Sequence, residues 1–435
     1  MSLPPPPAPA AAGDPADEPG SPSGAPGTDA DTSTSRRGSR KGRGRRKHTI
    51  GYVLLTSVVV LGMVTALTMV FLYRHYNGNI EVDDGQKGLE NRPDKIEVAG
   101  PQEPLNILVM GIDSREGDNN IDGLTGLGDR SDTTILIHLS ADRKRAYGIS
   151  IPRDSIVDRP YCKSGDVPPA TDSWNAAYTY GQSGCTMQQF EQLTGVRLDH
   201  HVVVDFSGFK GMVDAVGGVR MCIPEPIEDR SHGIFIEAGD DRLLKGQQAL
   251  DYVRVRYGVG DGSDISRTRR QQAFIASLAE TVVSRGTLTN PLKVVKFLDA
   301  ATKSLKVDPG LKDLTKLGGL GFQFKDIGLD DIQFITIPNA YFPTDSEHPG
   351  KVYWTDDAAV VWKAVANDRP IPRRLLGGAI KAKGAGGRDT DKTDEPSSTG
   401  TPDATTTGPE GTATEPSTPQ YTNMYDDPSK NGLCA

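Results

Sequence analysis

Three short charged clusters lie where the hydrophobic pattern predicts that strands begin or end. Residues 111–115 follow one apolar run, residues 129–132 precede the next, and Arg153 and Asp154 follow a third. Ligands of open α/β sheets bind beyond the carboxyl ends of the strands, so we expect Asp113 and Arg153 to lie beside a substrate. For any one Arg–Asp pair, the alternative is a solvated surface ion pair.

A fourth cluster is rich in arginine. Arg254 and Arg256 alternate with apolar residues and would share one face if the chain is extended there. Arg267, Arg270 and Gln271 have the spacing that places them on one helical face. Arginines this crowded repel one another unless an anion neutralises them, and guanidinium groups bind phosphate in a bidentate manner. The cluster therefore predicts a phosphate-binding site.

Asp113 and Asp132 have arginines nearby and no strong nucleophile beside them. This combination indicates metal-assisted phosphoryl transfer, in which positioning and charge neutralisation do most of the chemistry. Mg²⁺ commonly uses one or two carboxylates together with substrate phosphates and water. We therefore expect both aspartates to hold Mg²⁺ or Mn²⁺, and we expect Asp132, Asp113 and Arg153 to be the catalytic residues.

The apolar pattern also predicts the elements that position these clusters. Strands are predicted at 105–110, 133–139, 145–150, 202–206 and 332–337. Helices are predicted at 174–180, 186–194, 206–216, 245–252, 267–285, 293–298, 311–320 and 356–366. Strands that alternate with helices imply an α/β fold around a largely buried sheet.

The stretch 50–73 has no charged residue and is long enough to cross the ~30 Å hydrocarbon core as a helix. A cleaved signal peptide is the alternative, but the apolar run exceeds the usual ~7–15 residues. Lys and Arg crowd between residues 36 and 47, which predicts a cytoplasmic N-terminus and an exported remainder. The basic block lacks interleaved aromatic residues, so we expect no nucleic-acid partner.

Composition divides the chain into five parts. Residues 1–49 and 381–435 are rich in small, polar and Pro residues without an apolar period, which predicts disordered tails, the first basic and cytoplasmic and the second acidic. Between them we expect the transmembrane helix at 50–73, an extracellular stalk at 74–103 and an extracellular catalytic domain at 104–380.

All four cysteines follow the membrane stretch, which suits disulfides in an exported domain. Four cysteines allow three pairings. We favour Cys162–Cys185, because a loop-like segment separates these two, and this leaves Cys222–Cys434 as the other pair. The absence of a C-x-x-C spacing speaks against a zinc ribbon or a redox motif.

Taken in order, the clusters resemble the LytR-CpsA-Psr (LCP) family of Gram-positive and actinobacterial cell envelopes. The matching strings are Leu105–Asp113 (N-I-L-x-x-G-x-D), Arg130–Asp132 (R-S-D), Ser150–Asp154 (S-I-P-R-D), Asn175–Tyr178 (N-A-A-Y), Val213–Val219 (V-D-x-x-G-G-V), Ala249–Arg256 (A-L-x-Y-x-R-x-R) and Asp264–Gln271 (D-x-x-R-x-x-R-Q). The match covers about residues 105–280. Each string alone is weak, but the ordered combination is specific.

The resemblance implies a three-layer α/β/α sandwich with a central mixed sheet and a deep apolar groove for a polyprenyl chain. It implies an Mg-dependent phosphotransferase that moves a glycan phosphate from a polyprenyl-pyrophosphate-linked wall polymer, teichoic-acid-like or another glycopolymer, to a peptidoglycan sugar hydroxyl. The other product is polyprenyl phosphate. The implied partners are this donor, the peptidoglycan acceptor and the membrane, which a single helix crosses to place the domain outside the cell.

The resemblance also assigns roles to residues. Asp113 and Asp132 would hold Mg²⁺ (or Mn²⁺), and either could take the proton of the sugar hydroxyl. The residues expected at the pyrophosphate are Arg115, Arg130, Arg153, Arg254, Arg256, Arg267, Asp264 and Gln271.

Two places depart from the family pattern. The connection 116–129 is longer than expected, and its acidic residues have the spacing of a calcium loop with Asp at the last position. A polar turn is the alternative for this connection. Trp174 stands where the family usually has an aliphatic residue, either for local packing or as an aromatic platform for a sugar.

Two other classes of function stay open. One is a membrane-bound envelope regulator or transcriptional attenuator, but a DNA-binding role needs a folded cytoplasmic module, and residues 1–49 show no helix-turn-helix pattern. The other is a polyprenyl-pyrophosphate phosphatase or binder, which would act without a sugar acceptor.

Overall fold

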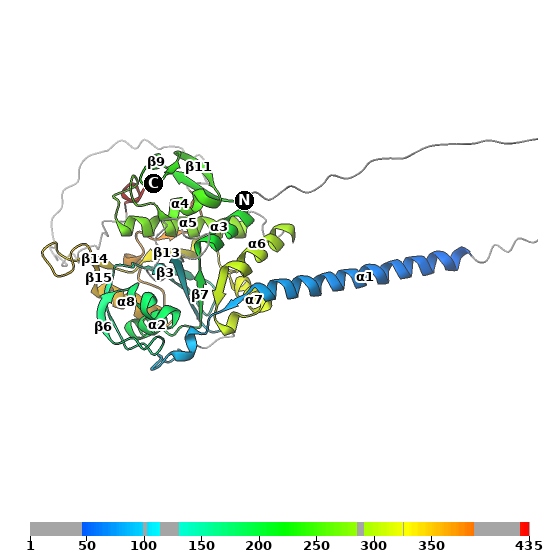
Figure 1. Ribbon diagram of the computed structural model, residues 1–435, viewed down its shortest axis with the longest axis horizontal. Helices are drawn as coiled ribbons and strands as arrows, with labels where there is room; N and C mark the ends of the chain where they lie inside the picture. The colour runs from blue at the N-terminus through cyan, green and yellow to red at the C-terminus, as the bar shows by residue number, and fades with distance from the viewer. Residues whose placement is uncertain are drawn as a thin grey trace, which may run out of the picture. The chain divides into compact units, whose positions relative to one another are not determined.

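The computed structural model describes residues 46–98, 102–113, 130–284, 291–324, 326–386 and 427–434 (Figure 1). The side chains of Asp113 and Arg130 lie outside this description. Among the described residues, those up to Thr65 and those from Ala66 onward belong to two separate units, of which the second is the larger.

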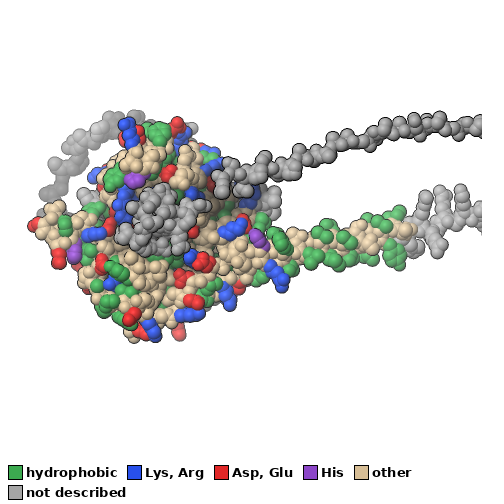
Figure 2. All heavy atoms as spheres, in the orientation of Figure 1, with side chains coloured by type: hydrophobic (Ala, Val, Ile, Leu, Met, Phe, Trp, Pro, Cys, Tyr) green, Lys and Arg blue, Asp and Glu red, His purple; other side chains and the backbone are tan. Residues whose placement is uncertain are grey.

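The first described element is a long helix, α1 (Arg46–Asn79). Its residues Thr49–Asn79 are long and apolar enough to cross a membrane. Most of the large apolar side chains between Ile50 and Tyr73 are exposed (Figure 2). A helix without a buried face is typical of a lipid-facing span, because a helix packed on a core shows a one-sided apolar stripe.

A mixed sheet of eight strands forms the centre of the larger unit, in the order β1-β12-β7-β2-β3-β4-β13-β16. β3 is antiparallel to both β2 and β4, so the carboxyl ends of β2 and β4 meet the start of β3 at one edge. The strands are β1 (Glu81–Val82), β2 (Leu105–Asp113), β3 (Arg130–Leu139), β4 (Ala146–Ile151), β7 (His200–Val204), β12 (Leu305–Val307), β13 (Ile332–Thr336) and β16 (Ile380–Lys381).

Helices cover both faces of the sheet, which gives the three-layer α/β/α arrangement (Figure 1). One face carries α2 (Ala176–Thr194) and α8 (Asp356–Ala366). The helices of the other side are α3 (Phe206–Ala215), α4 (Gly246–Arg254), α5 (Asp264–Ser284), α6 (Pro291–Ser304) and α7 (Leu314–Gln323). The expected fold class is therefore confirmed.

The two faces of the sheet differ in burial. Leu108, Met110 and Leu136 point toward α2 and α8 and are completely buried. Val109 and Ile137, on the opposite face of β2 and β3, are only partly buried. Their partners on the same face, Ile107 and Ile135, are buried, so the exposure on this face is limited to individual side chains. At these side chains the helices of the α3 side leave apolar sheet surface partly uncovered.

Short antiparallel pairs lie outside the main sheet. They are β5 (Ile156–Arg159) with β6 (Ala170–Ser173), β8 (Val219–Ile223) with β11 (Gly239–Leu244), β9 (Ile227–Asp229) with β10 (Ile234–Ile236), and β14 (Asn339–Tyr341) with β15 (Val352–Trp354). Short 3-10 helices complete the fold at Gly85–Gly88, Pro309–Leu311, Leu329–Asp331, Arg373–Leu375 and Pro428–Asn431. The strands of these pairs are too short to show a periodic pattern in the sequence.

Residues 74–103 were expected to form an extracellular stalk, and in the part that the structure describes this segment contacts the folded domain. β1 pairs with β12 at the edge of the sheet. Arg92 Nη2 lies 2.5 Å from Glu191 Oε1 on α2. Glu191 is fully buried, so its charge requires a partner of opposite sign. These contacts make the segment part of the folded domain.

The expected disordered tail at 381–435 is wrong at its two described ends. β16 pairs with β13. Residues 427–434 pack on the domain, with Asn431 fully buried. Cys434 forms a disulfide with Cys222 there, and Cys162 forms one with Cys185. Both expected pairings are present, and the second one explains why the end of the chain is ordered.

Candidate active site

Asp132 is the extra residue of a β-bulge. Gly111 pairs with Thr133, but the next residue of β2, Ile112, pairs with Ser131, so Asp132 has no opposite residue. Bulges occur frequently beside active sites, where they redirect a side chain. The bulge lies at the edge where β2 and β4 end. The local backbone thus presents the Asp132 carboxylate at the predicted place.

Arg153 connects the strand ends. It follows β4, and its Nη1 donates to Asp132 Oδ1 at 2.7 Å. Its Nε lies 3.4 Å from Asp264 Oδ1 at the start of α5 and 3.6 Å from Asp154 Oδ2. Burial opposes its charge, but these three carboxylates outweigh burial and raise the pKa of Arg153. The guanidinium is therefore charged and held in place.

Asp264 is the centre of an arginine cluster. Its Oδ1 lies 2.6 Å from Arg267 Nη2 and 3.1 Å from Arg256 Nη2, in addition to its contact with Arg153. Burial raises the pKa of Asp264 even though the arginines act in the opposite direction. Its other oxygen, Oδ2, is buried and has no hydrogen-bond partner among the described residues. Three guanidinium groups thus converge on one carboxylate.

Gln271 connects β3 to the end of α4. Its Oε1 accepts a hydrogen bond from Thr133 Oγ1 at 3.2 Å, and its Nε2 donates to the Val253 carbonyl at 3.0 Å. Thr133 follows Asp132 directly. Gln271 therefore supports the site from behind the bulge, as expected of a residue that holds the cluster together.

The structure corrects the interpretation of Arg254. The chain is not extended through Arg254 and Arg256, because α4 runs to Arg254. The guanidinium of Arg254 lies over the ring of Phe206, 4.5 Å from its centroid. Arg254 and Arg256 therefore do not share one strand face, although both lie at the same junction between α4 and α5.

Arg270 also differs from expectation. It is fully buried, and it donates to the carbonyls of Val255 and Asn431 and to Ser266 Oγ. Burial lowers the pKa of Arg270 to about 10. Its neighbour Arg269 donates to the Gly378 carbonyl. Backbone carbonyls thus hold this pair, and no phosphate is needed to explain it.

Several expected site residues lie outside the described residues. They are Arg115, the connection 116–129 with its calcium-loop pattern, and the side chains of Asp113 and Arg130. The backbones of Asp113 and Arg130 pair with each other at the same edge of the sheet as Asp132. Their roles stay predictions.

Two residues differ from the sequence-based expectation: Lys351 lies at the site although it was not predicted there, and Trp174 does not line the site. Lys351 Nζ lies 2.5 Å from Asp154 Oδ1. It is far along the chain from the motifs, so no local pattern could reveal it. Trp174 is fully buried and donates to Thr134 Oγ1 at 3.0 Å. It is a core residue, so of the two alternatives for Trp174 the structure supports local packing and contradicts an aromatic platform for a sugar.

The carboxylates of the described residues have the ligand chemistry that a magnesium ion requires. Asp132 and the unpaired Oδ2 of Asp264 provide the hard oxygen atoms that Mg²⁺ prefers. Within the described residues, no group of three His, Cys, Asp or Glu could hold a metal by itself.

Residues 72–367, which contain Asp132, Arg153 and Asp264, match the LytR_cpsA_psr family. The chain is 37% identical over 212 residues to the probable cell wall biosynthesis protein LcpB of Corynebacterium glutamicum. That match covers 47% of this chain and 48% of LcpB, so it spans about half of the relative's length. The chain is also 29% identical over 272 residues to the polyisoprenyl-teichoic acid–peptidoglycan teichoic acid transferase TagU of Enterococcus faecalis, covering 61% of this chain and 80% of TagU.

Among solved structures, the crystal structure of protein gbs0355 from Streptococcus agalactiae has the same fold. The TM-score is 0.51 at 20% identity, over 64% of this chain and 91% of that chain. The family match extends over more than half of the sequence and includes the bulge, the arginine cluster and the sheet that positions them. The chain therefore belongs to the LytR_cpsA_psr family.

Proposed function

We propose that the chain is a membrane-anchored phosphotransferase. It moves a glycan phosphate from a polyprenyl-pyrophosphate-linked wall glycopolymer to a peptidoglycan sugar hydroxyl. The observation that carries this proposal is the convergence of Arg153, Arg256 and Arg267 on Asp264, next to Asp132. Three guanidinium groups held in fixed positions are suited to bind a pyrophosphate with little reordering.

The named activity of a relative supports the same reaction. TagU of Enterococcus faecalis is named for the transfer of teichoic acid from a polyisoprenyl carrier to peptidoglycan. The identity of the polymer that this chain transfers is part of the proposal. A teichoic-acid-like polymer or another wall glycopolymer with a phosphate at its reducing end fits the arginine cluster equally well.

The partly uncovered apolar surface offers a place for the lipid of the donor. Val109, Ile137 and Val204 lie on the sheet face that the α3 side leaves partly open. β2, which carries Val109, ends at Asp113 beside the arginine cluster. A polyprenyl chain on this face would bury apolar area at about 25 cal/mol per Å². The pyrophosphate would then lie at the strand ends.

The topology follows from the charge pattern. The basic block between residues 36 and 47 holds the N-terminus in the cytoplasm, and α1 crosses the membrane. The domain after α1 is then outside the cell, where its two disulfides persist. The acceptor, peptidoglycan, is in the same compartment.

The reaction has one bond made and one bond broken at phosphorus. The acceptor hydroxyl oxygen bonds to the phosphorus next to the glycan, and the bond from this phosphorus to the polyprenyl phosphate oxygen breaks. The hydroxyl proton passes to the carboxylate of Asp132 or Asp113. Arg153, Arg256 and Arg267 neutralise the anionic leaving group, polyprenyl phosphate. Asp113 and Asp132 would hold Mg²⁺ or Mn²⁺, which would supply further neutralisation of the pyrophosphate.

The full-length protein in detergent tests this proposal. The assay supplies Mg²⁺, a synthetic polyprenyl-pyrophosphate-linked glycan and uncrosslinked peptidoglycan, and it measures glycan bound to peptidoglycan. Arg153→Ala and Asp132→Ala should abolish transfer, and a chelator should abolish it until Mg²⁺ is restored. Arg374→Ala is the control, because Arg374 forms an exposed ion pair with Asp357 on α8. Transfer retained in both site variants would disprove the mechanism, and product formed without acceptor would identify a phosphatase.

A further inference from the structure

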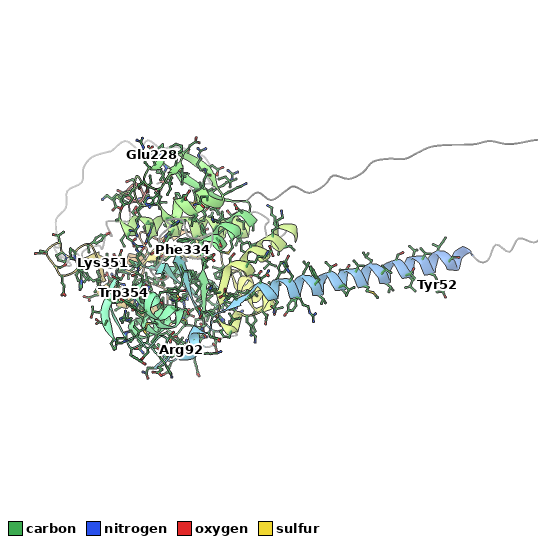
Figure 3. All side chains as sticks on the ribbon, in the orientation of Figure 1. Tyr52, Arg92, Glu228, Phe334, Lys351 and Trp354 are labelled. Atoms are coloured by element: carbon green, nitrogen blue, oxygen red, sulfur yellow. A yellow bond between two sulfur atoms is a disulfide. The ribbon has the colours of Figure 1, made fainter. Side chains whose placement is uncertain are left out.

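The β14–β15 hairpin is fixed to the segment that carries Arg153. Lys351 Nζ lies 2.5 Å from Asp154 Oδ1. The Val352 amide donates to the Asp154 carbonyl at 3.2 Å, and Trp354 Nε1 donates to Ser155 Oγ at 3.2 Å. Figure 3 labels Lys351 and Trp354 at this end of the molecule. Side-chain and backbone contacts thus hold the hairpin beside the site.

The register of the hairpin separates its side chains into two faces. Ala340 pairs with Tyr353, and the Phe342 amide donates to the Lys351 carbonyl at 2.9 Å, which continues the ladder by one pair. Residues opposite each other in an antiparallel pair share a face, and alternate residues change face. Phe342, Lys351 and Tyr353 therefore share one face.

The other face belongs to the core. Val352 is buried, and Trp354 packs against Trp174 and Trp362, with ring centroids 6.0 Å and 5.6 Å away. This packing decides the orientation of the hairpin. The face that carries Lys351 and Tyr353 is turned away from the core and carries the side chain that reaches Asp154.

The outward face carries a cluster of rings that hold one another in place. The ring centroid of Phe342 lies 5.1 Å from that of Tyr353 and 5.3 Å from that of His348, both in edge-to-face geometry. Tyr353 is nevertheless 39% exposed. A packed but exposed ring with a polar tip suits a sugar, whose ring has apolar C–H faces and hydroxyl edges. We call Phe342, His348 and Tyr353 the hairpin platform.

The charge near the platform favours a neutral ligand over the anionic donor. Asp345 and Glu347 lie exposed in the loop between the two strands. Their carboxylates repel a phosphate-bearing polymer. Two of the arginines proposed for the donor, Arg256 and Arg267, approach Asp264 from the junction of α4 and α5, whereas the hairpin contacts Asp154, the neighbour of Arg153. The donor and the ligand of the hairpin would therefore contact different elements of the protein on either side of Arg153.

We propose that the hairpin platform is the subsite for the acceptor glycan. It binds a neutral pyranose strand and holds it so that one sugar hydroxyl faces the phosphorus beside Arg153 and Asp132. The inference rests on the proposed function, because the acceptor of that reaction is a glycan. It adds residues of the β14–β15 hairpin that specify the acceptor.

Two measurements on the full-length protein in detergent test the subsite. The first is the KM for uncrosslinked peptidoglycan at saturating donor, and the second is binding of chitotetraose in the absence of donor. Tyr353→Ala should raise the acceptor KM and weaken chitotetraose binding, each by about tenfold, while the KM for the donor stays unchanged. Tyr353→Trp should keep the acceptor KM and the chitotetraose affinity close to those of the wild type, because the aromatic ring and not the phenol hydroxyl makes most of the contact with the sugar.

The matched control is Phe235→Ala. Phe235 is an exposed aromatic residue on another hairpin strand, β10, with 59% exposure. An unchanged acceptor KM in Tyr353→Ala, or an equal increase in Phe235→Ala, would overturn the subsite. If the wild-type protein transferred nothing, the proposed function would fail. The chitotetraose comparison of wild type with Tyr353→Ala would then still decide whether the platform binds a glycan.

Discussion

Arg153 Nη1 lies 2.7 Å from Asp132 Oδ1, and Arg153 follows the end of β4, the antiparallel neighbour of the strand that carries Asp132. Thr134 and Ile151 are a paired position of β3 and β4, and each site residue is two positions beyond that pair. The β-bulge of β3 lies at Asp132 itself, two residues before Thr134. The ion pair is therefore a product of strand register and does not depend on a flexible loop.

Arg153→Lys is expected to lower transfer by about 10²-fold with little change in thermal stability. Lysine keeps the charge, but its single ammonium cannot reach Asp132 and Asp264 as the guanidinium fork does. Initial rates and a thermal melt of the full-length protein check this. A variant with wild-type rates would mean that charge alone is needed at this position.

We predict that the folded domain loses stability in acid when the carboxylate of Asp83 becomes protonated. Burial opposes its charge, but hydrogen bonds from His201, the Gly85 amide and Ser183 outweigh burial and lower its pKa to about 2. A depressed carboxylate pKa stabilises the fold above the unfolded-state pKa, and this contribution is lost as the pH falls toward the folded-state value. Stability should therefore fall between about pH 4 and pH 2.

Unfolding of wild type and Asp83→Asn across this pH range tests the assignment. The Asn variant should lose this part of the pH dependence, because it has no carboxylate to protonate. Asp84→Asn is the control, since Asp84 is next to Asp83 but pairs with Lys87 on the surface. Equal pH curves for wild type and Asp83→Asn would contradict the role of Asp83.

Arg270→Met is expected to destabilise the domain by about 1–3 kcal/mol. The substitution removes the buried guanidinium that donates hydrogen bonds to the carbonyls of Val255 and Asn431. Chemical denaturation provides the measurement. Arg374→Met, at an exposed ion pair, should change stability little. Similar effects of the two substitutions on the unfolding free energy would show that Arg270 does not hold the backbone at Val255 and Asn431 together.

Gly148→Ala is expected to destabilise the sheet by about 1–3 kcal/mol. Gly148 pairs with Phe334 across β4 and β13, and a Cβ atom there would lie 2.3 Å from the ring of Phe334, which Figure 3 labels. Gly319→Ala on α7 has open space around the new Cβ and should stabilise by about 0.5–1 kcal/mol. Opposite signs in the two unfolding free energies are the expected result, and a neutral Gly148→Ala would show that Phe334 can move.

The central strands and the meeting of Asp132 with Arg153 were predictable from the sequence. Both rest on local patterns, namely apolar runs and charged residues at their ends. The two helices predicted at 174–180 and 186–194 are one kinked helix, α2, with non-helical backbone at Gly181 and Gln182. The sequence pattern showed the interruption but could not show that the two parts continue in one element.

Other features depend on contacts between distant parts of the chain, which a local pattern does not contain. Lys351 reaches Asp154, almost two hundred positions earlier in the sequence. The anchored segment 427–434 follows a low-complexity stretch and is fixed by Cys434. Arg254 was misplaced because an alternating pattern suggested a strand where α4 ends. The role of Trp174 likewise follows from its packing against Phe190 and Trp354, which lie elsewhere in the sequence.

The disulfide between Cys222 and Cys434 has a practical consequence for protein engineering. Lys430 and Asn431 accept hydrogen bonds from Asp261, Ser266 and Arg270, which surround the loop between Arg256 and Asp264. An affinity tag or fluorescent protein inserted directly after Cys434 would follow this bridge and lie close to that loop. Such a fusion would report on, and perturb, the neighbourhood of the arginine cluster, so an internal label elsewhere is the safer choice.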